Sequence, residues 1–144
     1  VASVVQLRRV NVPKDLRGLA EAGAGATLAC STSRIVMATT YVPEGLDEME
    51  KMARCLAPVE PDVLVLLGFQ RMIGSDERVL KALAVWNSGE ASSLLSRISP
   101  PVVGVYSERG DYEGGFGSVD ELARAIVEEG RRRGYLPHHP RRLE

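Results

Sequence analysis

A thiol, three hydroxyl groups and a guanidinium stand together in the segment ACSTSR, which contains Cys30 and Arg34. Hydroxyl groups and an arginine at the end of an apolar run can hold a phosphate group, so Ser31, Thr32, Ser33 and Arg34 are candidate ligand-binding residues. A catalytic cysteine also needs an activated thiolate and a loop of hydrogen-bond donors, which the apolar IVMA that follows does not supply. We therefore expect Cys30 and Cys55 to be buried, unreactive thiols.

The segment GDYEGGFG, residues 110–117, is rich in glycine but lacks the G-x-G-x-x-G order of dinucleotide-binding turns and lies late in the chain. It predicts a mobile surface loop.

His138 and His139 stand between prolines, with no carboxylate or cysteine at ligand spacing, and indicate a flexible tail over residues 137–144. The sequence predicts neither a metal site nor another cofactor, and it shows no catalytic constellation.

Five arginines lie close together near the C-terminal end of the sequence: Arg131, Arg132, Arg133, Arg141 and Arg142. Such a cluster can bind the phosphates of RNA, and arginines at the end of a helix also complement the helix dipole without any partner. The formal net charge of the chain is −1, so attraction for nucleic acid must come from a local patch. These arginines are the candidate RNA-binding residues.

The polar connection GFQRMIGS follows the apolar run DVLVLL, and its default interpretation is a surface turn. We expect Gln70 and Arg71 to be exposed and the preceding Val63, Val65 and Leu67 or their neighbours to be buried. Connections between a strand and a helix are also frequent ligand sites in α/β proteins.

With 144 residues, 44% of them hydrophobic, the chain has the length and composition of one globular domain, which we place at residues 1–136. No apolar stretch approaches the ~18 residues needed to span a bilayer. The opening VASVVQLRR is apolar and then basic, the reverse of a secretory signal, so we expect a cytoplasmic protein. Arginine greatly outnumbers lysine, which is typical of a GC-rich genome or a hot habitat, and we expect a thermophile.

Short β-rich runs alternate with helical patterns along the chain. The expected strands are residues 3–10, 62–69 and 100–106, and residues 27–42 form either a hairpin or a strand followed by a helix start. The expected helices begin at Pro13, Leu46, Ser75, Ala91 and Ser118, and NSGE separates the third from the fourth. Ser118 and Glu121 form a capping box that makes the last helix the best-defined element. The pattern predicts a layered, single-domain α/β fold with a mixed central sheet flanked by helices.

Three segments resemble the small accessory subunit of the KEOPS tRNA-modification complex, the PRPK-binding protein family. They are VVQLRRVNVPKDLRGLAEAG, RIVMATTYV, and DVLVLLGFQRMI followed by VLKALAV. The resemblance implies helices at residues 62–69 and 79–85. Met72 stands where the family has a glutamine, and the spacing from Gly68 to Arg71 is longer by one residue than in the family motif.

The resemblance implies a non-catalytic subunit that binds a kinase-like partner protein and tRNA during synthesis of threonylcarbamoyl-adenosine. Gln70, Arg71, Met72 and Ile73 would then form the partner-binding surface, with the arginine cluster as the RNA-binding surface. The alternative is an α/β enzyme or sensor that binds a small phosphorylated ligand at strand ends. In that case the segment 31–34 or the loop 110–117 would close over the ligand.

Overall fold

The computed structural model describes residues 2–7, 13–31, 34–68 and 74–136, with the backbone alone for residues 2–7, 31, 34, 36, 48 and 49. The chain divides into two compact units, residues 1–69 and 70–144. Strands and helices alternate in both units, which confirms the α/β class. The single domain over residues 1–136 stays a prediction, and the predicted tail at 137–144 lies outside the described residues.

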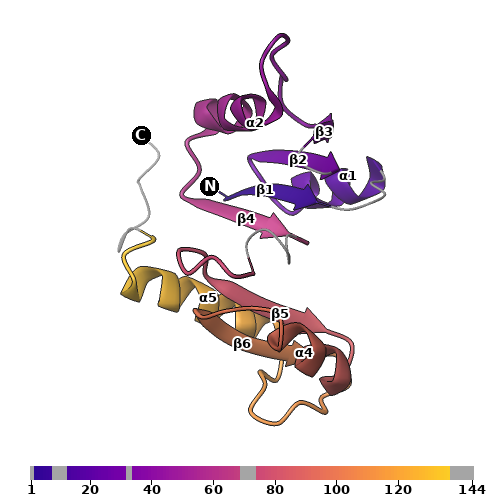
Figure 1. Cartoon of the computed structure of the whole chain (residues 1–144), viewed down its shortest axis with the longest axis vertical. Coiled ribbons are helices and arrows are strands. Elements are labelled where there is room, and N and C mark those ends of the chain that lie inside the picture. The colour runs from indigo at the N-terminus through magenta and orange to yellow at the C-terminus, as the bar shows by residue number, and fades with distance from the viewer. Residues whose placement is uncertain (1, 8–12, 32–33, 69–73, 137–144) are drawn as a thin grey trace. The chain divides into compact units, whose positions relative to one another are not determined.

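The first unit contains a mixed sheet with the strand order β3-β2-β1-β4 (Figure 1). Its elements are β1 (Ala2–Leu7), α1 (Pro13–Glu21), β2 (Ala26–Ser31), β3 (Arg34–Ala38), α2 (Glu48–Leu56), the short 3-10 helix η1 (Ala57–Val59) and β4 (Val63–Leu67). Strand β1 pairs in parallel with β2 and β4, whereas β2 and β3 pair in antiparallel fashion. Residues 27–42 therefore contain a hairpin, which decides between the two alternatives, and the predicted mixed sheet is confirmed.

Strand β2 is the centre of the first unit, because its side chains from Ala26 to Cys30 are completely buried. Leu28 and Cys30 on this strand pack in one core cluster with Cys55 of α2. The Cys30 thiol lies 3.6 Å from the sulfur of Met52, and the Cys55 thiol donates a hydrogen bond of 3.1 Å to the carbonyl oxygen of Tyr41. Both cysteines are buried, as predicted.

Strand β4 shows that residues 63–67 of this apolar run form a strand, as the pattern predicts, and not the helix that the family resemblance implies. Among the described strands β4 pairs with β1 alone, so it forms an edge of the sheet. Leu66 packs against the core, but Leu67 is 37% exposed. The prediction that this run is buried is therefore only partly correct, because an edge strand is covered less completely than a central one.

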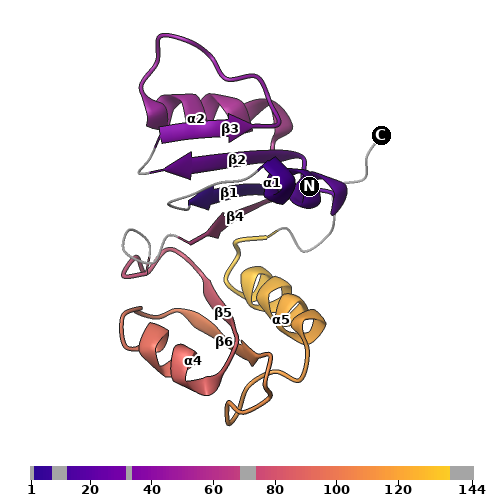
Figure 2. The same cartoon turned by 90° about the vertical axis from the view of Figure 1, so that its right-hand side faces the viewer.

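The second unit is built on two parallel strands, β5 (Lys81–Val85) and β6 (Val102–Ser107). Helix α4 (Ser88–Leu95) connects them, and α5 (Val119–Arg132) follows the loop after β6. Figure 2 shows α4 and α5 on opposite sides of the two strands. Val85, Ala91 and Val105 form the core on the α4 side. The unit thus has three layers, helix, sheet and helix, around a β-α-β connection.

The prediction of a helix beginning after Ser75 is wrong, because residues 81–85 form strand β5. The Asp76 carboxylate accepts a hydrogen bond of 2.9 Å from the backbone N–H of Arg78, which closes a local turn in place of a first helical turn. Lys81 is nearly buried, and its ammonium group donates to the carbonyl oxygens of Asp76 and Val79. The family resemblance implies a helix over the same residues, and the structure differs from it there as well.

The NSGE segment is the start of α4 and not an interruption between two helices. The Asn87 side chain accepts a hydrogen bond of 2.9 Å from the backbone N–H of Glu90 and so caps the helix. The predicted N-cap of α5 is confirmed, because the Ser118 hydroxyl accepts from Glu121 N at 3.1 Å. The Glu121 carboxylate accepts from Gly117 N at 2.9 Å, one residue before the N-cap N–H that a standard capping box uses. Within the described residues, no helix has the length and apolar character needed to cross a membrane.

Candidate functional site

The carboxyl ends of β5 and β6 lie side by side, because Val85 and Ser107 are paired in register. The backbone pairing continues beyond the strands: Glu108 N donates to the Val85 carbonyl at 2.9 Å and Arg109 N donates to the Trp86 carbonyl at 3.1 Å. The start of α4 and the loop 107–118 are therefore adjacent. Ligands of α/β proteins are most often bound at such an edge, outside the carboxyl ends of parallel strands.

Asp111 fastens this loop to the start of α4. One of its carboxylate oxygens accepts hydrogen bonds from the Ser107 hydroxyl at 2.6 Å and from the backbone N–H of Ser88 at 2.9 Å. The other oxygen accepts from the Ser88 hydroxyl at 3.2 Å. These bonds, first that from Ser107, lower the pKa of Asp111. The carboxylate is therefore held in one place against the nearly buried Ser107.

The N-terminal end of α4 already carries its own acceptors. Asp111 takes the Ser88 N–H, Asn87 takes the Glu90 N–H, and the Glu90 carboxylate accepts from Trp86 N at 2.8 Å. A phosphate bound at a helix start uses these same N–H groups. Because a carboxylate of the chain occupies that position, a phosphorylated ligand would have to displace Asp111.

Phe116 closes the loop back onto β6. Its backbone N–H donates to the Val105 carbonyl at 2.8 Å, and it forms an isolated parallel bridge with Tyr106. The Phe116 ring covers Gly104 so closely that a β-carbon at Gly104 would lie 2.6 Å from a ring carbon. Gly104 is thus needed for close approach. Residues 110–117 form a loop, as predicted, and its predicted mobility stays a prediction.

A cavity of about 290 Å³, open to solvent, lies between the end of β6 and this loop. The Tyr106 hydroxyl, at its edge, donates a hydrogen bond of 2.8 Å to the Glu108 carboxylate. This bond raises the pKa of Tyr106 and fixes the orientation of Glu108. The volume of the cavity is just below the ~300–1,000 Å³ range of small-molecule sites. Besides three loop glycines, the lining residues are Tyr106, Ser107, Glu108, Arg109, Tyr112 and Phe116.

Trp86 and Arg109 stand at the same edge of the sheet. The Trp86 side chain is 57% exposed, and the Arg109 guanidinium lies 5.7 Å from the centre of its ring, a cation–π contact. The loop 107–118 carries three carboxylates, of which Glu108 alone lines the cavity while Asp111 and Glu113 do not, and one guanidinium, that of Arg109. The local charge of the loop is therefore negative.

The other candidate ligand residues are only partly described. Ser31 and Arg34 are paired at the tip of the β2–β3 hairpin, and their side chains, with Thr32 and Ser33, lie outside the described residues. The candidate partner-binding residues Gln70, Arg71, Met72 and Ile73 also lie outside them, as do Arg141 and Arg142. Their predicted roles and the predicted exposure of Gln70 and Arg71 stay predictions.

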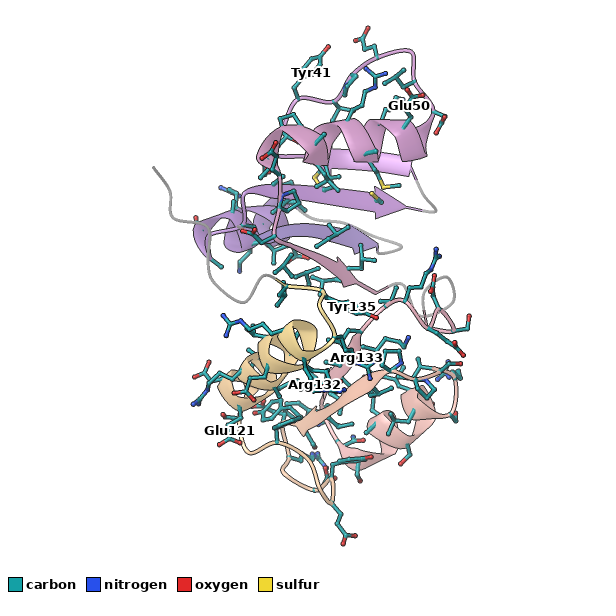
Figure 3. All side chains as sticks on the ribbon, turned by 90° about the vertical axis from the view of Figure 1, so that its left-hand side faces the viewer. Tyr41, Glu50, Glu121, Arg132, Arg133 and Tyr135 are labelled. Atoms are coloured by element: carbon teal, nitrogen blue, oxygen red, sulfur yellow. The ribbon has the colours of Figure 1, made fainter. Side chains whose placement is uncertain are left out.

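The described arginines of the predicted RNA-binding cluster lie at the end of α5, where Figure 3 labels Arg132 and Arg133. Both contact one carboxylate: Arg132 donates to Glu129 at 2.8 Å and Arg133 donates to it at 2.6 Å. Arg132 first, and then Arg133, lower the pKa of Glu129 to about 2. Glu129 therefore offsets part of the positive charge that the sequence places there.

Trp86, Tyr106 and Glu108 were not among the site residues predicted from the sequence. The available signal was their position, since each ends or follows an apolar strand in a β-α-β pattern.

Across residues 2–7, 13–31, 34–68 and 74–136, no group of three or more histidine, cysteine, aspartate or glutamate side chains is placed to hold a metal ion.

Comparisons of the chain with models of protein families, with curated proteins and with solved structures found no match.

Proposed function

We propose that this chain is a small-molecule-binding α/β protein, an enzyme or sensor whose ligand occupies the cavity between β6 and the loop 107–118. The observation that carries the proposal is the cavity itself, at the carboxyl end of a β-α-β unit, with a fixed loop as its wall. The position of the cavity at the carboxyl ends of parallel strands is the position at which α/β folds generally bind their ligands.

The fixed geometry of the loop supports this function. Asp111 holds one side of the loop on α4, and Phe116 holds the other side on β6. A wall that is already ordered loses little conformational entropy when a ligand binds, so a small cavity can still bind with useful affinity. The Tyr106 hydrogen bond similarly fixes Glu108 before a ligand arrives.

The proposal is tested by purifying the full chain under native conditions and identifying bound small molecules by native mass spectrometry. Each candidate is then added back while the melting temperature is measured. Saturation at about 100 times Kd should stabilise the protein by about 2.7 kcal/mol. Glu108→Ala should reduce this effect, and Glu113→Ala, which changes a loop carboxylate that does not line the cavity, should not. Stabilisation that is equal in the wild type and in Glu108→Ala would place the ligand elsewhere.

A second candidate function is that of a non-catalytic accessory subunit that binds a kinase-like partner and tRNA in threonylcarbamoyl-adenosine synthesis. The observation that favours it is the exposed basic end of α5, where Arg131, Arg132 and Arg133 follow one another. Arg132 and Arg133 share Glu129, so their attraction for a phosphate is reduced by a neighbouring negative charge.

Binding of tRNA at several salt concentrations tests this second function. Changing the three arginines to glutamine should weaken binding and reduce the slope of log affinity against log salt by about one unit for each phosphate that the variant no longer neutralises. Glu129→Gln should strengthen binding, because it removes the competing carboxylate. The matched control is Glu113→Gln, which removes one negative charge far from the cluster in sequence. Absence of salt-dependent tRNA binding in the wild type, alone and with a kinase-like partner, would exclude the function.

A further inference from the structure

Lys81 is a positive charge that is largely removed from water at the start of β5. The residue is only 8% exposed, and a lysine is almost never buried unless other groups are paired with it. Among the described residues no carboxylate forms an ion pair with Lys81. Other groups must therefore replace the water that the ammonium group loses.

Two backbone carbonyl groups of a single turn replace that water. The Lys81 ammonium group donates a hydrogen bond of 2.6 Å to the carbonyl oxygen of Asp76 and one of 2.8 Å to that of Val79. The Asp76 carbonyl also accepts from the backbone N–H of Val79 at 3.2 Å, which closes the turn 76–79. Carbonyl oxygens that converge on one point are groups with which proteins also bind metal cations.

The Asp76 carboxylate adds negative charge to the same turn. Hydrogen bonds from the side chain and backbone of Arg78 lower the pKa of Asp76 to about 2, and the positive charge of Lys81 acts in the same direction. The carboxylate is therefore ionised at neutral pH. Arg78 offsets part of its charge, so the two carbonyl groups remain the direct partners of Lys81.

The turn belongs to the segment that leads into the second unit. The Gly74 carbonyl accepts a hydrogen bond of 2.7 Å from Ser99 N, and Lys81 N donates one of 3.1 Å to the Pro101 carbonyl. The segment thus begins and ends beside the start of β6. Between these two points, at residues 75–80, every residue is exposed or half-buried. Apolar packing therefore contributes little there, and the Lys81 ammonium group fastens the turn from inside.

We propose that the turn 76–79 is a cation-binding site that the protein fills with its own Lys81 ammonium group, and that this bound charge holds residues 74–80 on the second unit. The ligand class is an alkylammonium cation, which the lysine side chain supplies in tethered form. The site lies at the amino end of β5 and the proposed ligand cavity at the carboxyl ends, so the inference does not depend on the proposed function.

Chemical rescue tests the site in the full chain. Lys81→Ala removes the atoms from Cγ to the ammonium nitrogen, and n-propylammonium supplies the same atoms from solution. The variant should melt at a lower temperature than the wild type and should be cut faster by trypsin after Arg78, whose side chain is 88% exposed. At about ten times its Kd, propylammonium should raise the melting temperature of the variant by about 3 °C or more and should slow the cleavage again.

Two controls assign the rescue to the positive charge at this site. The neutral molecule 1-propanol has the size of propylammonium and should rescue neither property. Lys14→Ala, which changes an exposed lysine of α1, should show neither the loss nor the rescue. Recovery of Lys81→Ala by 1-propanol as strongly as by propylammonium, or recovery by neither, would overturn the inference.

A measurement on the wild-type protein decides the inference if Lys81→Ala does not fold. Acetylation of the native chain at neutral pH, followed by mass spectrometry, should modify Lys81 at least about tenfold more slowly than Lys14, because the reaction requires the turn to open first. Equal rates for the two lysines would show that the ammonium group is not held in the turn.

Discussion

Asp111 accepts two hydrogen bonds from Ser88, at 2.9 Å from the backbone N–H and at 3.2 Å from the hydroxyl, although the two residues are 23 positions apart. The contact joins the loop after β6 to the first residue of α4. It places a carboxylate at the positive end of the helix dipole and holds one wall of the cavity in position. The conformation of the loop and the stability of the helix therefore both depend on the Asp111 side chain.

Asp111→Ala should lower the melting temperature and loosen the loop, whereas Glu113→Ala in the same loop should have little effect. The pKa of Asp111 is lowered in the folded state, so its stabilising contribution is complete above the ordinary value of 3.8 and is lost as the pH falls through the lowered value. The difference in melting temperature between wild type and Asp111→Ala should accordingly shrink below pH 3.8. A difference that stays constant down to the lowest pH at which the protein folds would contradict this role.

Gly104→Ala should destabilise the protein by about 1–3 kcal/mol, because the new methyl group would collide with the Phe116 ring. Gly18→Ala is the control, since a β-carbon at this helical position meets nothing within 4 Å and should stabilise α1 by about 0.5–1 kcal/mol. Denaturant unfolding measures both changes. Partial rescue of Gly104→Ala by Phe116→Leu would show that the ring is the cause, and equal destabilisation in both backgrounds would argue against it.

Cys30 and Cys55 should resist alkylation in the folded protein, because both thiols are buried. Iodoacetamide at neutral pH should label neither residue until the chain is unfolded, when both should react. Mass spectrometry after timed labelling gives the rates. Fast, selective labelling of Cys30 in the native protein would restore the hypothesis of a nucleophilic cysteine in ACSTSR.

Glu129→Gln should remove a pH-dependent part of the stability. The folded-state pKa of Glu129 is about 2 against an ordinary value of 4.5, so the ion pairs with Arg132 and Arg133 stabilise fully above pH 4.5 and progressively less as the pH falls towards 2. The melting temperatures of wild type and Glu129→Gln should therefore converge at low pH. Glu128→Gln, at an exposed neighbouring position, is the control. Failure of the curves to converge would mean that the ion pairs are not the source of the difference.

Elements with local signals were predictable from the sequence. Ser118 and Glu121 identify the start of α5 because a capping box satisfies the helix N–H groups within four residues. The VLKALAV segment has no such signal, since its leucines fit a helix and a short strand equally well. Pairing with β6 decides the outcome, and that pairing depends on residues about 20 positions later, from Val102 to Ser107.

The candidate site was less predictable than the fold. The glycine content of residues 110–117 correctly indicates a loop, but the order of that loop comes from contacts with distant partners, Asp111 with Ser88 and Phe116 with Gly104. Neither pair is visible as a motif. By contrast, the sequence does carry a signal for the ion pairs of Glu129, because Arg132 and Arg133 follow it at the i,i+3 and i,i+4 spacings of neighbouring helix side chains, although the prediction of an RNA-binding cluster did not use it.

The most direct test of the ligand site is an NMR titration of the full chain with a metabolite extract, with every backbone amide followed at once. Binding in the cavity beside β6 predicts signal changes concentrated at residues 106–117 in the wild type and strongly reduced in Glu108→Gln. Changes confined to other parts of the chain, or the same changes in Glu108→Gln as in the wild type, would contradict the assignment of this cavity as the functional site.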